Sequence, residues 1–286
     1  GSEVWGPLCS PVLPTDIKKM VDIQLSFLRQ LCHLKCSVTP VIIFRELAEK
    51  PWVHRWWSQV LGFMHRLSVM PENNVHRDIL LDNIADAHDH PSCRNWANGI
   101  VAQYSLLGMA SPFSSSGIVG LSSIKFHVNM QDRLRRVWDG CHVSPRTAPS
   151  KGAKLCTYFA WFFRPSQLSF EPYYEVPMPI SRLRLLMQFR MGSHSLPVEQ
   201  GRLARPAIPR HLRRCTFCDT GAPGDERHLV FDCPHFAHVR RQFQSLFDDA
   251  DGTMQLFFWH TDQKAVCRCL TAILDLADDS NSDMSS

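Results

Sequence analysis

The sequence predicts a mainly α protein with a helical body, a small irregular module towards the C-terminus and a C-terminal helix. Three observations support this fold class. Apolar residues recur every three or four positions in several segments, few segments alternate as strands do, and Cys and His residues cluster within one short stretch. With 286 residues, 44% of them hydrophobic and 20% charged, the chain has the composition of a globular protein and enough length to bury a core.

Helical periodicity organises the first half of the chain. Residues 14–31 begin with the capping sequence Pro-Thr-Asp and continue with apolar residues at intervals of three and four, which predicts an amphipathic helix. A proline opens a second predicted helix at 51–70, and the next proline ends it. Weaker patterns predict helices at about 77–87 and 124–138. Residues 109–123, rich in Ser, Gly and Pro, predict a long loop between them.

The middle of the chain has less regular patterns. Residues 140–154 lack periodicity and are typical of a linker. Residues 155–163 form an aromatic run that fits either a helix or a strand. The proline-rich residues 164–180 predict an extended connection. Ser181 is the predicted cap of a helix that ends at about Arg190.

These patterns divide the chain into four predicted regions. Residues 1–139 form a helical region, and residues 140–180 form a linker and connector. Residues 181–247 contain an Arg-rich helix and the small module, and residues 248–286 contain a C-terminal helix and an acidic tail. The residues with the most distinctive chemistry all fall in the third region.

Four potential metal ligands lie within 19 residues of that region, as Cys215, Cys218, His228 and Cys233 in the spacing C-x2-C-x9-H-x4-C. Two cysteines separated by two residues in a tight turn can both reach one ion, and Cys3His sets bind Zn²⁺ tetrahedrally. Because four protein ligands leave no position open for water, the predicted zinc is structural. A helix predicted after Pro234 would place Cys233 at a helix N-terminus, where the dipole favours a thiolate.

Other residues compete with this assignment. His235 and His238 could supply the fourth ligand, and the four residues could also be ordinary members of a chain with 11 Cys and 14 His. Cys267 and Cys269 form a second close pair within a helical pattern. Side chains two apart on a helix diverge, so we expect this pair in the core or on the surface rather than on a metal.

Charge is distributed unevenly along the chain. The net charge is +4, yet residues 181–241 carry 11 Arg, no Lys and 5 acidic residues, and residues 242–286 have a net charge of −6. Guanidinium groups bind phosphates bidentately, so this segment indicates contact with a nucleic-acid backbone. The alternative is a solvated face or ion pairs with the acidic tail. Phe217 is the one candidate for stacking on a base. The candidate phosphate-binding residues are Arg202, Arg205, Arg210, Arg213, Arg214, Arg227, Arg240 and Arg241.

No catalytic site is predicted. The chain contains no Gly-rich phosphate loop and no paired carboxylates in apolar surroundings. The aspartates of Phe247-Asp248-Asp249 follow the aromatic residue directly, whereas the metal-binding pair of reverse transcriptases has one residue between. The adjacent Cys141 and His142 lie in the predicted linker and are not placed to act as nucleophile and base.

Composition also indicates a compartment. No apolar run approaches the roughly 18 residues of a membrane span, and the start of the chain lacks an initiator Met and a signal-peptide pattern. Eleven cysteines are an odd number in a long chain, which favours a reducing compartment over a disulfide scaffold. We expect an intracellular protein of the cytoplasm, the nucleus or both, without a membrane partner.

Several segments resemble the C-terminal region of LINE-type (non-LTR) retrotransposon reverse transcriptases. Residues 183–199 are similar to a helix that carries the family string "LRLG-H-L". Residues 213–234 resemble its Cys-Cys-His-Cys knuckle and the "GDE-HLLF-CP" string. Residues 1–6 are similar to the segment after the polymerase palm, and residues 23–29 and 44–51 to the thumb helices.

The resemblance implies a thumb, a connector and a zinc knuckle that follow the palm and fingers of a reverse transcriptase. The catalytic aspartates would then lie upstream of Gly1, and residues 72–180 resemble no part of the family. The implied function is a nucleic-acid-binding accessory region that grips template RNA or target DNA during target-primed synthesis, with the upstream palm and fingers as its protein partner. The alternative is a zinc-stabilised helical domain with a structural or protein-interaction role.

Overall fold

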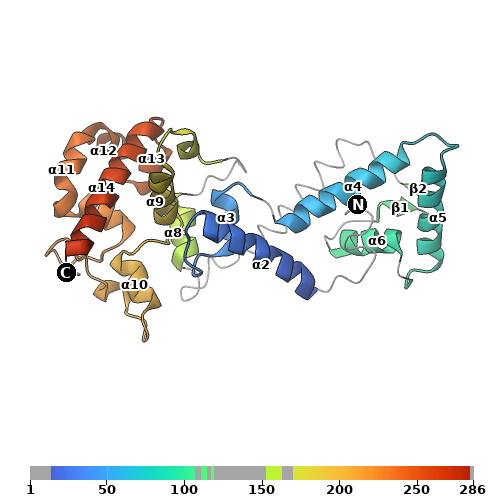
Figure 1. The fold of residues 1–286 in the computed structure, drawn as a ribbon, viewed down its shortest axis with the longest axis horizontal. Helices are drawn as coiled ribbons and strands as arrows, with labels where there is room; N and C mark the ends of the chain where they lie inside the picture. The colour runs from blue at the N-terminus through green and yellow to red at the C-terminus, as the bar shows by residue number, and fades with distance from the viewer. Residues whose placement is uncertain are drawn as a thin grey trace. The chain divides into compact units, whose positions relative to one another are not determined.

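The structure is a computed structural model that describes residues 14–49, 51–93, 95–106, 111–114, 117–118, 153–162 and 170–283. Within these residues the fold is mainly helical, as predicted (Figure 1). Strand in the described part of the chain consists of a short antiparallel pair, in which Phe113 faces Ile118 and Ser114 faces Gly117. None of the described helices is both long and apolar enough to cross a membrane.

The elements alternate with short connections along the chain. In its first part they are α2 (Pro14–Leu31), α3 (Pro40–Glu46), α4 (Trp52–Ser68), α5 (Val75–Asp89), α6 (Trp96–Leu106), β1 (Phe113–Ser114) and β2 (Gly117–Ile118). In its second part they are α8 (Ala153–Trp161), η2 (Pro172–Glu175), α9 (Ile180–Arg190), α10 (Pro197–Leu203), η3 (Arg210–Leu212), η4 (His228–Asp232), η5 (Pro234–Phe236), α11 (Ala237–Gln242), α12 (Gln244–Ala250), α13 (Met254–Trp259) and α14 (Gln263–Asp283).

The chain divides into two compact units. Unit 1 comprises residues 1–25 and 50–144, and unit 2 comprises residues 26–49 and 145–286. The boundary falls inside α2, so unit 2 is discontinuous in sequence and combines α3 with the elements from α8 onward. The four regions predicted from the sequence stay predictions.

Helices α2, α4 and α5 confirm the predicted helices of the first half. Pro51 is the N-terminal flanking residue of α4, and the helix ends before Pro71. Helix α5 starts earlier than expected because Asn74 caps it, with Oδ1 accepting the His76 backbone N–H at 2.9 Å. Helix α6 was not predicted, since apolar residues in its sequence do not follow one face. The predicted helix at 124–138 lies outside the described residues.

The core of unit 1 lies among α4, α5 and α6. Leu67 and Leu80 are buried there, and the ring of Phe63 packs edge-on against Trp96, with 6.3 Å between ring centroids. Asn83 of α5 accepts the Ala97 backbone N–H at 2.9 Å, which satisfies a donor in the first turn of α6.

In unit 2 the structure corrects three predictions. The aromatic run at 155–163 is helical in its described part, which settles the open choice between helix and strand. The predicted extended connection contains a 3-10 turn, η2. Helix α9 begins at Ile180 after Pro179 without a side-chain cap, so the predicted cap at Ser181 was wrong; the fixed φ of the proline initiates the helix instead.

An ionic cluster lies in the core of unit 2. Glu46 of α3 is fully buried and pairs with Arg190 of α9 through both Nε and Nη2. The hydroxyls of Tyr158 and Tyr173 donate to the same carboxylate at 2.7 and 2.8 Å, and Arg190 Nη2 contacts Glu171 at 2.9 Å. Each Glu46 oxygen is therefore satisfied, which is the condition for burying a carboxylate.

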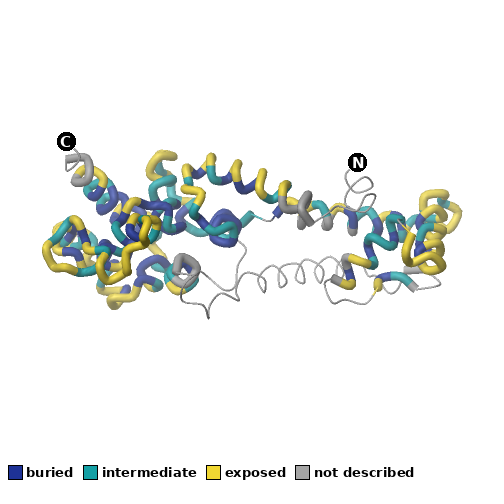
Figure 2. Tube along the Cα trace, turned by 90° about the horizontal axis from the view of Figure 1, so that it is seen from below, coloured by how far each residue is buried: buried dark blue, intermediate teal, exposed yellow. Residues whose placement is uncertain are grey.

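Aromatic rings and helix α14 complete this core. The Arg190 guanidinium lies 4.9 Å from the ring centroid of Phe162 and 5.7 Å from that of Phe258. Cys267 and Cys269 of α14 are both buried, which confirms the predicted core position. Figure 2 shows exposed residues (yellow) on the outer turns of the helices and buried ones (dark blue) on their inner sides.

Candidate metal centre

The first two candidate ligands lie on a short hairpin. Its arms are joined by the Cys215 backbone N–H, which donates to the Ala222 carbonyl at 2.8 Å, and by the Gly224 N–H, which donates to the Arg213 carbonyl at 2.8 Å. At its tip, the backbone N–H of Phe217 points at the Cys215 sulfur at 3.4 Å. The turn therefore places the two cysteines on one side of the hairpin, as the C-x2-C spacing predicts.

The other two candidate ligands flank a single turn of π-helix, His228–Asp232. The Cys233 backbone N–H donates to the His228 carbonyl at 2.7 Å, which closes the turn. A ring closed between residues five apart brings the chain back to the same side, so the four-residue spacing suits two ligands of one ion. Asp225 begins this turn, because its Oδ1 accepts the His228 backbone N–H at 2.9 Å.

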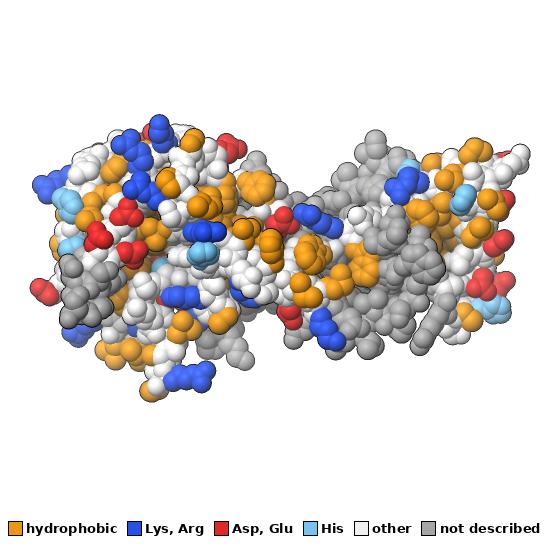
Figure 3. All heavy atoms as spheres, viewed as in Figure 1, with side chains coloured by type: hydrophobic (Ala, Val, Ile, Leu, Met, Phe, Trp, Pro, Cys, Tyr) orange, Lys and Arg blue, Asp and Glu red, His pale blue; other side chains and the backbone are white. Residues whose placement is uncertain are grey.

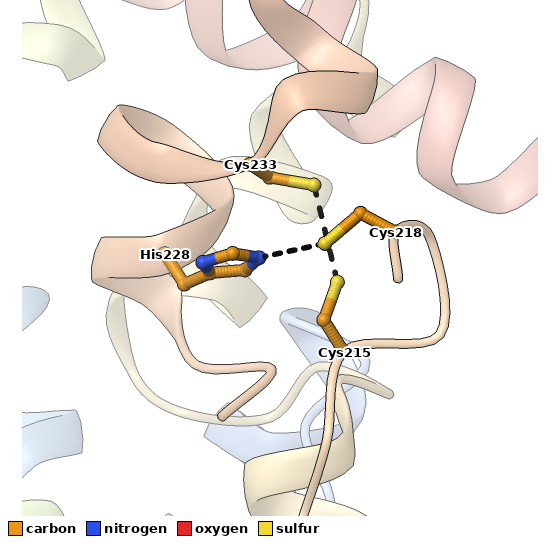
Figure 4. A group of neighbouring side chains, drawn as sticks. All are labelled: Cys215, Cys218, His228 and Cys233. Carbon is orange, nitrogen blue, oxygen red and sulfur yellow. Dashed lines mark hydrogen bonds between the residues drawn. The ribbon is translucent and has the colours of Figure 1, made fainter. Parts of the chain in front are cut away.

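All four side chains converge on one point (Figure 4), and their ligand atoms lie within 4.8 Å of one another. The sulfurs of Cys215 and Cys233 are 3.9 Å apart, and the Cys218 sulfur is 3.3 Å from His228 Nε2. The cysteines are free thiols. Metal–sulfur bonds of about 2.3 Å and metal–nitrogen bonds of about 2.0 Å in a tetrahedron require separations of about 3.5 to 3.8 Å. The group can therefore hold one metal ion.

The three thiols differ in acidity. Burial raises the pKa of Cys215, and it raises the pKa of Cys233 to about 12. Burial acts in the same direction on Cys218, but hydrogen bonds from Thr220 and His228 outweigh it and lower the pKa of this thiol to about 6. Cys218 is thus a thiolate at neutral pH, whereas the other two need a cation to hold them deprotonated.

Elements after the cluster fix Cys233 in place. Pro234 occupies the first position of η5, as expected. The predicted single helix is divided into η5, α11 and α12, because the backbone of Phe243 interrupts it between the two α-helices. Arg240 of α11 donates from Nη2 to the Cys233 carbonyl at 2.5 Å.

A buried His–Glu pair supports the module from below. His194, in the loop after α9, contacts Glu226 with 3.0 Å between Nε2 and Oε1, and both side chains are buried. The Leu196 backbone N–H donates to His194 Nδ1 at 3.3 Å, so Nε2 carries the proton that it donates to the carboxylate. Sequence reasoning did not assign these roles to His194, Glu226 or Asp225, although they lie in the strings that carry the family resemblance.

Five of the eight candidate arginines are held by neighbours within the module. Three pair with carboxylates at 2.7 to 2.9 Å, and two donate to backbone carbonyls. The pairs are Arg202 with Glu199, Arg210 with Asp225 and Arg227 with Asp232, and the carbonyl contacts are Arg213 to Val198 and Ile208 and Arg240 to Cys233. Their acidic partners belong to the module rather than to the acidic C-terminal segment.

The remaining three arginines, Arg205, Arg214 and Arg241, are exposed, and their side chains contact no other residue in the part of the chain that the structure describes. Arg182, from α9, forms an ion pair with Asp275 of α14 at 3.5 Å. The structure thus separates arginines that hold the module together from arginines whose charge is available to a ligand.

The competing residues do not join the metal-binding group. His235 and His238 are exposed and lie outside the four-residue cluster. The ring of Phe217, half-buried, stacks on His235 with 6.0 Å between ring centroids and also packs on Phe236 at 5.4 Å. Phe217 is therefore less available for stacking on a base than its position at the hairpin tip suggests.

Comparisons with protein-family models, with curated proteins and with solved structures give no match to this chain. The described residues define a class by fold and site alone: a mainly helical protein with a small Cys3His cluster that can hold a metal ion.

Proposed function

We propose that the Cys3His cluster holds a structural Zn²⁺ and that residues 181–241 bind nucleic acid through their phosphates. The observation that carries this proposal is the combination of four converging ligands with exposed arginines that have no protein partner in the described residues. We further propose that the chain is an accessory region of a LINE-type reverse transcriptase, with template RNA or target DNA as its ligand and the palm and fingers as its partner.

The choice of zinc follows from the ligand chemistry. Three thiolates and one imidazole in a closed tetrahedral group suit Zn²⁺ better than ions that prefer oxygen ligands. The ion would join the hairpin that carries Cys215 and Cys218 to the π-helical turn that carries His228, a connection of otherwise few backbone hydrogen bonds. With Zn²⁺ the four ligands carry a net charge of −1, so the group itself does not attract phosphate.

Phosphate binding is therefore assigned to the arginines around the cluster. Arg214 directly precedes the first ligand, Cys215, and Arg241 lies on α11. Figure 3 shows basic side chains (blue) on several parts of the surface of unit 2. Arginine contacts to phosphate release counterions, so binding should weaken steeply with salt and depend little on sequence.

The assignment to a reverse transcriptase rests on the resemblance of residues 183–199 and 213–234 to the family. Two contacts are consistent with a conserved role of those strings in holding the module: Asp225 caps the turn of His228, and Glu226 pairs with His194. No polymerase chemistry is assigned to this chain, since the predicted catalytic aspartates would lie in a separate segment.

A binding titration tests the nucleic-acid proposal. Fluorescence anisotropy with single-stranded RNA and with duplex DNA, each at two salt concentrations, should show salt-dependent binding. Arg214→Gln with Arg241→Gln should lower the slope of log K against log salt by about 1.8, because each phosphate contact contributes about 0.9. Arg202→Gln is the matched control, since its guanidinium is already paired with Glu199. An unchanged slope in the double variant contradicts the proposal.

The structural alternative is supported by a specific observation of its own, namely that five candidate arginines already serve contacts within the module. If the cluster only clamps the last helices, the protein should bind zinc and fold stably but show no affinity for RNA or DNA even at low salt. That outcome would favour a structural or protein-interaction role.

A further inference from the structure

One segment of the module projects from it with a firmly held base. After α10 the chain forms a loop, residues 203–212, and returns through η3. Arg213 fixes the base, because its Nη1 donates to the Val198 carbonyl at 2.8 Å and its Nε donates to the Ile208 carbonyl at 2.7 Å. The Ile208 backbone N–H donates to Gly201 at 2.8 Å. A Cβ at Gly201 would lie 2.6 Å from Arg213 Cγ, so only glycine leaves room for this arrangement.

The projecting loop (residues 203–212) exposes aliphatic side chains. Leu203 is 46% exposed, Ile208 is 40% exposed and Leu212 is 52% exposed. Figure 3 shows apolar (orange) and basic (blue) side chains together on the projection below α10. A loop that exposes three aliphatic residues on a fixed base forgoes their burial within its own module, which is a common feature of interaction surfaces.

Charge narrows the class of partner. Residues 200–218 contain no Asp or Glu and five arginines, and two of these, Arg205 and Arg214, are exposed without a protein partner in the described residues. An acid-free segment of this kind is complementary to a polyanion. Arginine rather than lysine is used throughout it, and the guanidinium fork matches the geometry of phosphate oxygens.

We propose that the projecting loop docks into duplex nucleic acid, with Arg205 and Arg214 on backbone phosphates and the aliphatic side chains of Leu203, Ile208 and Leu212 wedged against base steps in the minor groove. Proteins that insert aliphatic wedges between flanking basic residues kink the duplex they bind. The loop contains no Phe, Tyr or Trp, and single-strand readers depend on such rings for stacking. The inference rests on the proposed function and specifies its ligand as a duplex.

Two variants separate the roles of the loop. Leu203→Ser, Ile208→Ser and Leu212→Ser together should weaken binding to duplex DNA roughly tenfold or more, abolish bending measured by energy transfer between end labels, and leave the salt slope unchanged. Arg205→Gln with Arg214→Gln should lower the salt slope by about 1.8. Ile180→Ser with Leu256→Ser is the control, since both side chains are exposed in unit 2 away from the loop and should leave affinity unchanged.

The probes are a labelled DNA duplex, one of its strands alone, and vesicles of phosphatidylcholine with phosphatidylserine. Tighter binding to the single strand overturns the inference, as does equal duplex affinity of the aliphatic triple variant, and in both cases the proposed nucleic-acid function stands. Absence of binding by the unmodified protein to either DNA probe contradicts the proposed function and the inference together. Vesicle binding that the triple variant loses, without duplex binding, would assign the loop to a membrane surface instead. If the triple variant loses its helical circular dichroism, Leu212→Ser alone provides the same test.

Discussion

Unit 2 contains two polar clusters, the ionic cluster around Glu46 and Arg190 and the Cys3His cluster of the module, and they differ in how their charge is balanced. The carboxylate of Glu46 meets the guanidinium of Arg190 and two tyrosine hydroxyls, so protein groups satisfy it. The thiols have no comparable cation within bonding distance, and two of them have a raised pKa because of burial. The first cluster is completed by the chain itself, whereas the second is built to receive an ion.

The two clusters also differ in the reach of their connections. Glu46 and Arg190 are 144 residues apart in sequence and join α3 to α9, whereas the four metal ligands lie within 19 residues. Damage to the ionic cluster should therefore destabilise the whole unit, and damage to the Cys3His cluster should be confined to the module. Each prediction below tests this difference, beginning with the largest effect.

Removal of the metal ligands should have the largest local effect. Cys215→Ser with Cys218→Ser should abolish the one zinc per chain seen by native mass spectrometry, because structural zinc contributes on the order of 10 kcal/mol to small modules. Hydrogen exchange should then show loss of protection at residues 213–236 and retained protection around Arg190. Full protection of the module in the metal-free variant would contradict the metal assignment.

Breaking the ionic cluster should destabilise all of unit 2. Glu46→Gln leaves the buried Arg190 without its main counter-charge, which typically costs about 3 to 5 kcal/mol. Urea unfolding followed by circular dichroism measures this loss. Glu175→Gln, at an exposed position of η2, is the control and should change the free energy of unfolding by no more than about 0.5 kcal/mol.

Alkaline pH should weaken the same core through its tyrosines. Burial, followed by the charge of Glu46, raises the pKa of Tyr158, Tyr173 and Tyr174 above the ordinary value of 10.0. Since the folded pKa lies above the unfolded one, the stabilisation is complete below pH 10 and is lost as the pH rises beyond it. The free energy of unfolding should fall by about 4 kcal/mol per pH unit there. Tyrosinate absorbance should rise together with unfolding, and a gradual rise in the folded protein would argue against burial.

A crowded glycine gives the smallest of these effects. A Cβ at Gly224 would lie 2.8 Å from Pro197 and 3.0 Å from the backbone of Cys215, so Gly224→Ala should cost about 1 to 3 kcal/mol by overpacking. Gly221→Ala is the paired comparison, because its φ of +72° is strained for alanine but no atom lies within 4 Å of the added methyl. Zinc affinity, measured by competition with a chelator, should fall more for Gly224→Ala than for Gly221→Ala.

Sequence reasoning predicted the features that depend on neighbours along the chain. The apolar periodicity of α2 and α4 predicted those helices, and the spacing of Cys215, Cys218, His228 and Cys233 predicted their convergence, because a tight turn and a short helical turn suffice to bring them together. The four ligands needed no knowledge of the rest of the fold.

The features it missed depend on partners far away in sequence or on details of backbone geometry. Nothing in the pattern around Glu46 indicates a partner at Arg190, since an ion pair leaves no periodicity. The division of the arginines into paired and free ones was also unpredictable, because Arg210 and Arg213 have similar sequence contexts and yet contact a carboxylate and backbone carbonyls respectively. Helices α3 and α10 are seven residues long each, too short for a helical pattern to be distinctive.

The pairing of Glu46 with Arg190 has a consequence for synthesis of the chain. A ribosome adds about 5 to 20 residues per second, so the 144 residues that separate the two partners take roughly 7 to 30 seconds to emerge. During this interval α3, whose Val41, Ile42, Ile43 and Phe44 are buried in the finished fold, has none of its partners from α8 to α13. Chaperones that cover short apolar segments on nascent chains are thus expected to engage residues 40–46, and to leave once α9 has been made.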